Sequence, residues 1–103
     1  MSKELIDNIK KYLEKVNNIY KIDKAFIYGS QISKTADEQS DIDIALVSSA
    51  FSGDRFKDNV NAGILTWGID TRIEPITFRP EDFNEDNIIA SEIIKNGEEI
   101  SIF

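Results

Sequence analysis

The sequence predicts an α/β (α+β) protein, in which helices and short strands follow one another along 103 residues. Two observations lead to this prediction. The N-terminal residues repeat their apolar side chains every three to four positions, as an amphipathic helix does. Two short apolar runs, AFIY and IDIAL, lie next to glycine and polar residues, as strands in a sheet do. We expect one domain, residues 1–103, with a modest hydrophobic core.

The first half of the chain is predicted to contain one helix and two strands. The helix covers residues 3–20, with inward positions at Leu5, Ile9, Tyr12, Leu13, Val16 and Tyr20. The first strand covers residues 24–28, and a short helical turn over residues 30–34 and a polar loop over residues 35–40 follow it. The second strand covers residues 41–48. Because apolar side chains occupy both of its faces, we expect this strand at the centre of the sheet.

The second half is predicted to contain a helix, a strand, a second helix and a final strand. After a turn at residues 49–53, the helix presents its apolar residues on one face, namely Phe56, Val60, Gly63, Ile64 and Trp67, and ends at Gly68. We expect Trp67 to anchor the core rather than to stack on a base. The third strand covers residues 69–78, where Pro75 indicates a sheet edge or a bulge. The remaining elements are a turn or one helical turn at residues 80–83 and a helix over residues 87–95 with Ile89, Ile93 and Ile94 as its inward candidates. Residues 98–103 are predicted either to add a short strand or to dock on a partner.

Two aspartates begin the second strand. Because alternate side chains of a strand share a face, Asp41 and Asp43 point to the same side, with Cα atoms about 6.6 Å apart. Two carboxylates at this separation repel each other unless a cation lies between them. Oxygen ligands of this kind suit Mg²⁺ or Mn²⁺. An isolated Asp-x-Asp is also common at a solvated strand edge. Whether it indicates a metal site here therefore depends on the motifs beside it in the sequence.

A glycine-serine pair ends the first strand. Gly29 lets the backbone turn without a Cβ clash, and Ser30 is suited to cap a helical turn whose free N–H groups would face a phosphate. On its own such a pair is typical of ordinary turns. Combined with Asp41 and Asp43, it predicts a phosphate-binding corner beside a metal site, as phosphoryl or nucleotidyl transfer requires.

The pattern Gly29-Ser30, ten residues and then Asp41-x-Asp43 resembles the signature of the DNA polymerase β nucleotidyltransferase superfamily. The short length and the wording SDIDI at residues 40–44 resemble its minimal nucleotidyltransferase (MNT) branch. The resemblance implies a mixed β-sheet flanked by helices, two divalent ions, and transfer of a nucleoside monophosphate from a triphosphate, with ATP as the expected donor. Matching motifs extend over residues 26–78, and the order of elements fits nearly the whole chain.

The family also uses a third carboxylate on the third strand, and two residues are candidates for it here. Asp70 and Glu74 would lie about 13 Å apart along a strand, so only one of them can join a compact metal cluster. We favour Glu74, as a metal ligand and as general base toward the acceptor hydroxyl, because it lies inside the strand. A surface charge on an edge strand is the other interpretation of Glu74.

The residues after the glycine-serine pair depart from the family pattern. Relatives commonly carry an arginine where this chain has Gln31, and a basic residue followed by glycine where it has Ser33 and Lys34. Lys34 supplies a positive charge one position along. The resemblance therefore assigns nucleotide binding to Gly29, Ser30 and Lys34.

Relatives in the MNT branch are usually encoded beside a helical partner of the HEPN class, as antitoxin and toxin. By resemblance, the acceptor is a hydroxyl on such a HEPN partner, and some members are thought to modify a tyrosine. The alternative is an inactive antitoxin that neutralises its partner by binding alone. Transfer to a small molecule such as an aminoglycoside is a third hypothesis, and we favour it least because no companion domain shapes a pocket.

Composition excludes several other classes. The net charge of −7 disfavours long nucleic acid as a ligand and is compatible with a metal-bound nucleotide or a basic protein partner. The chain has no cysteine and no histidine, which excludes disulfides, thiolate zinc sites and a histidine base. No apolar run reaches membrane-spanning length, and the N-terminal MSKE is not a signal peptide, so we expect a cytoplasmic protein.

Overall fold

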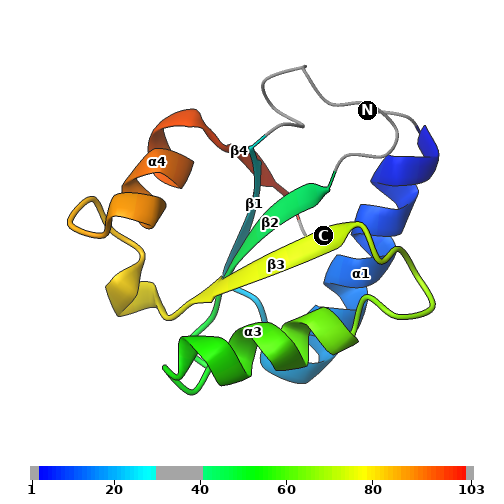
Figure 1. Cartoon of the computed structure of the whole chain (residues 1–103), viewed down its shortest axis with the longest axis horizontal. Helices are drawn as coiled ribbons and strands as arrows, with labels where there is room; N and C mark the ends of the chain where they lie inside the picture. Colours follow the sequence, from blue (N-terminus) through cyan, green and yellow to red (C-terminus); the bar gives the residue numbers. More distant parts are fainter. Residues whose placement is uncertain (1–2, 30–40, 102–103) are drawn as a thin grey trace.

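The computed structural model of the protein describes residues 3–29 and 41–101. Its centre is a four-stranded mixed sheet with the order β3-β2-β1-β4 (Figure 1). β1 (Lys24–Tyr28) pairs antiparallel with β2 (Ile42–Val47) and with β4 (Glu98–Ile100), whereas β3 (Ile73–Phe78) pairs parallel with β2. The expected mixed sheet flanked by helices is therefore confirmed.

Helices cover both faces of this sheet. One face carries α1 (Lys3–Tyr20) and α3 (Arg55–Ile64), and the other carries α4 (Ile88–Asn96) beside the 3₁₀ turn η1 (Pro80–Asp82) (Figure 1). Each face has its own cluster of buried apolar side chains. β2 contributes to both clusters, since five of its six residues are buried. The prediction of a central strand covered on both sides is confirmed.

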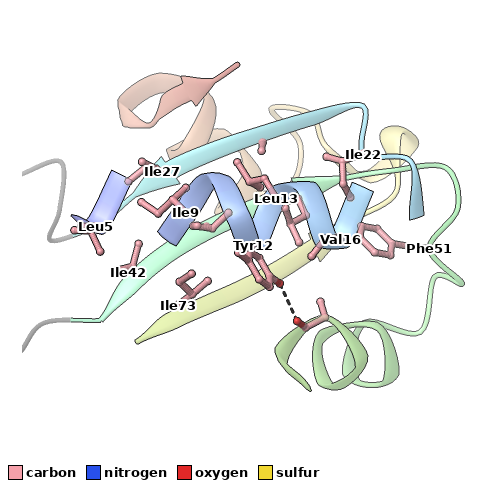
Figure 2. Close-up of a cluster of buried hydrophobic side chains, with 14 residues drawn as sticks. Leu5, Ile9, Tyr12, Leu13, Val16, Ile22, Ile27, Ile42, Phe51 and Ile73 are labelled. Atoms are coloured by element: carbon pink, nitrogen blue, oxygen red, sulfur yellow. Dashed lines mark hydrogen bonds between the residues drawn. The ribbon is translucent and has the colours of Figure 1, made fainter. Parts of the chain in front are cut away.

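α1 has the bounds that its periodicity predicts. Its buried residues are Leu5, Ile9, Tyr12, Leu13 and Val16, which repeat every three to four positions and face the sheet (Figure 2). The hydroxyl of Tyr12 donates a 2.8 Å hydrogen bond to the carbonyl oxygen of Ala62, drawn as a dashed line in Figure 2. This bond connects α1 to α3 inside the core.

α3 faces the core with a different side from the one predicted. Its buried residues are Asp58 and Ala62, and Thr66 of the following turn lies on the same side. Phe56 is 80% exposed and Trp67 is 66% exposed, so the expectation that Trp67 anchors the core is wrong.

The reason for this orientation lies at the start of α3. The Asp58 carboxylate is buried there and accepts hydrogen bonds from Ser52 N, Ser52 Oγ and Gly53 N, at 3.1, 2.8 and 3.1 Å. Asp54 caps the helix by accepting from Lys57 N. These bonds satisfy the buried carboxylate and hold the polar side of α3 inward.

β3 is shorter than predicted and forms one edge of the sheet, as Pro75 indicated. It begins at Ile73, because residues before it form a turn in which Ile73 N donates to Asp70 O. The carbonyl oxygens of Arg72 and Phe78 accept hydrogen bonds from the backbone N–H groups of Ile42 and Ser48. The backbone N–H and C=O groups of the even-numbered residues of β3 therefore point toward β2, and those of the odd-numbered residues point away from the sheet.

The outward backbone positions of β3 have no free N–H group. Ile73 N is bonded to Asp70 O, Pro75 has no N–H, and Thr77 N donates a 2.8 Å bond to Oδ1 of Asn59 on α3. This edge of the sheet is therefore closed to pairing with another strand.

The C-terminal elements match the predicted order. The side chain of Asn87 caps α4 by accepting from Ile89 N and Ala90 N. Ala90 and Ile93 are the buried residues of this helix, whereas Ile89 is 43% exposed, so the prediction that Ile89 faces inward is wrong. The short terminal strand is confirmed as β4.

Candidate active site

Strand register brings two of the predicted carboxylates side by side. Asp43 on β2 is the direct partner of Glu74 on β3, and Tyr28 on β1 is the partner of Asp43 on its other side. Neighbouring strands lie about 4.8 Å apart, so the three residues form one row across the sheet. The row lies on the face that α4 covers, because Ala45, two residues after Asp43, belongs to that core cluster.

The charges of this row act on one another. Burial raises the pKa of Asp43, and the nearby Asp41 carboxylate raises it further. The pKa of Glu74 is also raised, by burial, by the charge of Asp41, by a hydrogen bond from protonated Glu74 to Asp41, and by the charge of Asp43. Asp41, Asp43 and Glu74 therefore form one electrostatic cluster, and a cation would relieve their repulsion.

Gly29 lies directly against this cluster. Its φ of 79° falls in the left-handed region, and a Cβ built on it would overlap Oδ2 of Asp43 and lie 3.3 Å from its Cγ. A side chain at position 29 would therefore require the Asp43 carboxylate to move. The predicted phosphate-binding corner and the predicted metal ligand are in contact at this point.

The structure separates the two candidates for the third carboxylate. Asp70 lies before β3 and accepts bonds from Arg72 Nε at 3.0 Å and Arg72 Nη2 at 2.8 Å, and from Asn8 Nδ2 at 3.2 Å. The hydrogen bonds from Arg72 hold its pKa at about 2. Asp70 thus faces α1 and is held by Arg72, whereas Glu74 is the one placed beside Asp43.

Tyr28 also lies in the site, although no motif in the sequence points to it. Burial raises its pKa to about 12, and the charges of Asp43 and Glu74 contribute, against an opposite effect of Arg55. The phenol of Tyr28 is therefore neutral and lies half-buried beside the carboxylates. An antiparallel pairing of the first two predicted strands would have placed Tyr28 there, since it directly precedes Gly29.

The donor set fits a hard divalent cation, because it consists of carboxylate oxygens with Asp41 and Glu74 exposed to solvent. Within residues 3–29 and 41–101, no group of three His, Cys, Asp or Glu side chains is placed to hold a metal ion. The metal site thus stays a prediction. Ser30 and Lys34, the other predicted nucleotide ligands, lie outside the described residues.

A hollow of about 280 Å³ lies elsewhere, between α1 and β4. Its lining includes Ile6 and Ile9 of α1 and Ile27 of β1. Because Ile27 and Tyr28 are adjacent in a strand, the hollow opens on the sheet face opposite to the carboxylates. It is separate from the candidate site.

Comparison with known families decides how this arrangement is classified. The model of the family described as "Polymerase beta, Nucleotidyltransferase" matches residues 7–102. The chain belongs to the polymerase β nucleotidyltransferase family. The family supports a general nucleotidyl transfer function, and the four-stranded mixed sheet is the fold of this family.

A solved structure shares this fold. The crystal structure of a proposed nucleotidyltransferase from Sulfolobus solfataricus superimposes with a TM-score of 0.63 and 18% sequence identity, covering 96% of this chain and 87% of that chain. At this identity the likeness shows the fold alone. No protein with a curated description matches the sequence. Across the described part of the chain, none of the helices combines the length and apolar character needed to cross a membrane.

Proposed function

We propose that the protein transfers AMP from ATP to a hydroxyl group, and that Asp41, Asp43 and Glu74 hold the two magnesium ions, or manganese ions, that the reaction requires. The observation that most supports this is the register of Asp43 against Glu74, with Gly29 in contact with Asp43. When bound, the ions would neutralise charge on the triphosphate and lower the pKa of the acceptor hydroxyl.

The residues of the chain have separate roles in this proposal. The backbone at Gly29, with Ser30 and Lys34, holds the β- and γ-phosphates. Glu74 accepts the proton of the acceptor hydroxyl, a role that its raised pKa favours. The hydroxyl oxygen forms a bond to the α-phosphorus, the bond from that phosphorus to the bridging oxygen breaks, and pyrophosphate leaves.

The proposed acceptor is a hydroxyl of a helical HEPN-type partner, which the modification silences, so that the chain acts as the antitoxin of a toxin–antitoxin system. The charge of −7 supports a basic protein partner over nucleic acid. The identity of the neighbouring reading frame tests this pairing first: we expect a short helical protein with an Arg-x4-His motif.

Transfer is tested with ATP labelled at the α-phosphate, Mg²⁺ and the product of that reading frame. We expect label on the partner with the wild-type chain and none with Asp43→Asn. Asp86→Asn is the matched control, because it removes one exposed acidic charge outside the site and should transfer normally. Equal labelling by all three chains, or no labelling by any, would contradict the proposal.

A second candidate function, neutralisation by binding alone, has its own support. Gln31 stands where relatives commonly carry arginine, which leaves fewer charges for a triphosphate. In this case Asp43→Asn would still neutralise the partner in a growth assay. Loss of neutralisation by Asp43→Asn, with partner binding intact, would instead favour the enzymatic function.

A further inference from the structure

One side of α3 and of the turn that follows it presents a row of large apolar side chains to solvent. We call this row the α3 stripe, and it consists of Phe56, Val60, Ile64 and Trp67, which are 80, 45, 43 and 66% exposed. Their spacing of three to four residues places them on one side of the helix. That side lies opposite to Asp58 and Ala62, which face the core.

Other exposed apolar residues in the described part of the chain do not form such a row. Ile6 and Ile19 are thirteen positions apart on α1 and lie on different sides of that helix. Ile88, Ile89 and Ile94 point in different directions around α4. Isolated apolar residues on a surface are normal, but a contiguous row with two aromatic rings indicates an interaction surface.

The charge around the α3 stripe differs from that of the rest of the chain. Between residues 55 and 71 the acidic residues are Asp58, which is 4% exposed, and Asp70, whose side chain is 7% exposed. The exposed charged residues of α3 are Arg55, whose guanidinium lies over the Phe78 ring, and Lys57, and the exposed N-cap Asp54 directly precedes them. The helix that carries the stripe is thus less acidic than the chain as a whole, which has a net charge of −7.

The stripe is also arranged symmetrically along the helix. The aromatic residues Phe56 and Trp67 lie at its two ends, and the aliphatic residues Val60 and Ile64 lie between them. A second helix of the same sequence in the opposite direction would place Phe56 against Trp67 and Val60 against Ile64. Gly63 lies at the centre, where an added Cβ would meet no atom within 4 Å, so two backbones are free to approach there.

We infer that a second copy of this chain covers the α3 stripe, forming a two-fold symmetric dimer in which the two α3 helices are antiparallel. Lys57, in the N-terminal turn of each helix, would then face the carbonyl end of the other. The two aromatic rings alone remove about 300 Å² of surface per copy. That is a large share of the about 800 Å² per partner that stable interfaces bury.

The dimer leaves both candidate active sites accessible. The buried residue Ala62 of α3 belongs to the core cluster on the sheet face opposite to Asp43, Glu74 and Tyr28, and only Arg55 at the start of the helix reaches Phe78 of the other cluster. In Figure 1 α3 runs along the lower margin, and α4 lies on the other side of the sheet. The inference is thus independent of the proposed transfer activity, and either one is testable without the other.

Sedimentation analysis of the full chain, over a concentration series from micromolar upward, tests the dimer. We expect the wild type to sediment as a dimer and the double variant Phe56→Ser, Trp67→Ser to sediment as a monomer with an unchanged circular dichroism spectrum. Ile88→Ser is the matched control, since it removes a side chain that is 87% exposed outside the stripe, and it should remain a dimer. A monomeric wild type, or a double variant that still dimerises, would overturn the inference.

The antiparallel arrangement is tested by disulfide formation, since the chain has no cysteine of its own. Gly63→Cys places a thiol at the centre of the proposed interface, where the two copies approach within disulfide range. Asn61→Cys places an exposed thiol on the same helix outside the stripe. We expect mild oxidation to cross-link Gly63→Cys at least tenfold faster than Asn61→Cys, and equal rates would contradict the arrangement.

Discussion

The backbone of Gly29 lies so close to the carboxylate of Asp43 that a Cβ at position 29 would overlap Oδ2 and lie 3.3 Å from Cγ. The two residues are fourteen positions apart in the sequence and come together because β1 and β2 pair antiparallel, with Tyr28 opposite Asp43. The corner that ends β1 and the carboxylate near the start of β2 thus form one unit. A substitution at Gly29 should therefore displace the Asp43 carboxylate.

The first prediction concerns Gly29→Ala. Alanine at a φ of 79° costs about 1 kcal/mol in any context, and here its Cβ also displaces the Asp43 carboxylate. We expect the variant to lose Mn²⁺ binding, measured by titration calorimetry, and to unfold at lower temperature than the wild type.

Gly68→Ala is the matched control for that variant. Gly68 has a φ of 84°, but a Cβ on it would meet no atom within 4 Å. Gly68→Ala should lose only the stability that alanine loses in a left-handed backbone conformation, and it should bind Mn²⁺ as the wild type does. If the two variants behaved alike, contact between residue 29 and Asp43 would have no role in the site.

The second prediction concerns Asp43→Asn. The pKa values of Asp43 and Glu74 are raised in the folded protein, so their ionisation disfavours folding as the pH rises through those values. Removing one charge relieves this repulsion at neutral pH. Without divalent ions we expect Asp43→Asn to be more stable than the wild type by about 0.5 kcal/mol, or about 3 °C in Tm.

We expect magnesium to reverse this order. Saturating Mg²⁺ should raise the Tm of the wild type, because binding to the folded state stabilises it, and should leave Asp43→Asn unchanged. Thermal unfolding with Mg²⁺ and with EDTA measures both effects. A variant that gained as much from Mg²⁺ as the wild type would show that the ion binds elsewhere.

Local patterns in the sequence predict most elements of this fold, because those elements bury one continuous apolar face. α1, β1 and β2 repeat their apolar residues with the period of a helix or a strand, so their observed bounds are close to the predicted ones. α3 is different, since its apolar stripe is the exposed side. Periodicity gives the orientation of a helix only if its polar side is solvated, and here Asp58 is buried among backbone N–H groups.

Parts of the candidate site depend on pairing between strands, which local patterns in a single sequence do not reveal. Asp41 and Asp43 were identifiable from spacing within one strand. The choice of Glu74 over Asp70 depends on the register of β3 against β2. One local signal was present, since Asp70 is followed two positions later by Arg72, and such a pair forms its own ion pair in a turn. Tyr28 required the antiparallel register of β1.

The third prediction concerns Asp70→Asn. The pKa of Asp70 is lowered to about 2 by the hydrogen bonds from Arg72, so its ionised form stabilises the fold at pH values above its unfolded pKa. We expect the variant to lose about 1–2 kcal/mol of unfolding free energy at pH 7. The difference from the wild type should shrink as the pH falls below 4 and vanish below pH 2.

Urea unfolding of both chains at several pH values measures this difference. The pH dependence is the decisive feature, because a loss that stayed constant down to pH 2 would mean that the Asp70 charge has no part in it. Transfer activity serves as a second readout. It should persist in Asp70→Asn if Glu74 is the third carboxylate of the site.

The fourth prediction concerns Asn59→Ala, at the closed edge of the sheet. Oδ1 of Asn59 accepts from Thr77 N at 2.8 Å and from Thr77 Oγ1 at 2.7 Å, and Thr77 is only 1% exposed. Without the amide, a buried N–H and a buried hydroxyl lose their partner, which costs about 2 kcal/mol. The outward edge of β3 also gains a free N–H, so we expect faster aggregation on heating, measured by light scattering.

Asn61→Ala is the matched control for the two hydrogen bonds from Thr77 to Asn59. It makes the same substitution two positions along on α3, where the side chain is exposed, and alanine there should raise helix stability slightly. We therefore expect a lower Tm and more scattering for Asn59→Ala alone. If both variants unfolded at the same temperature without scattering, Pro75 and the turn at Ile73 would be sufficient to keep this edge closed, and the bond from Thr77 to Asn59 would be dispensable.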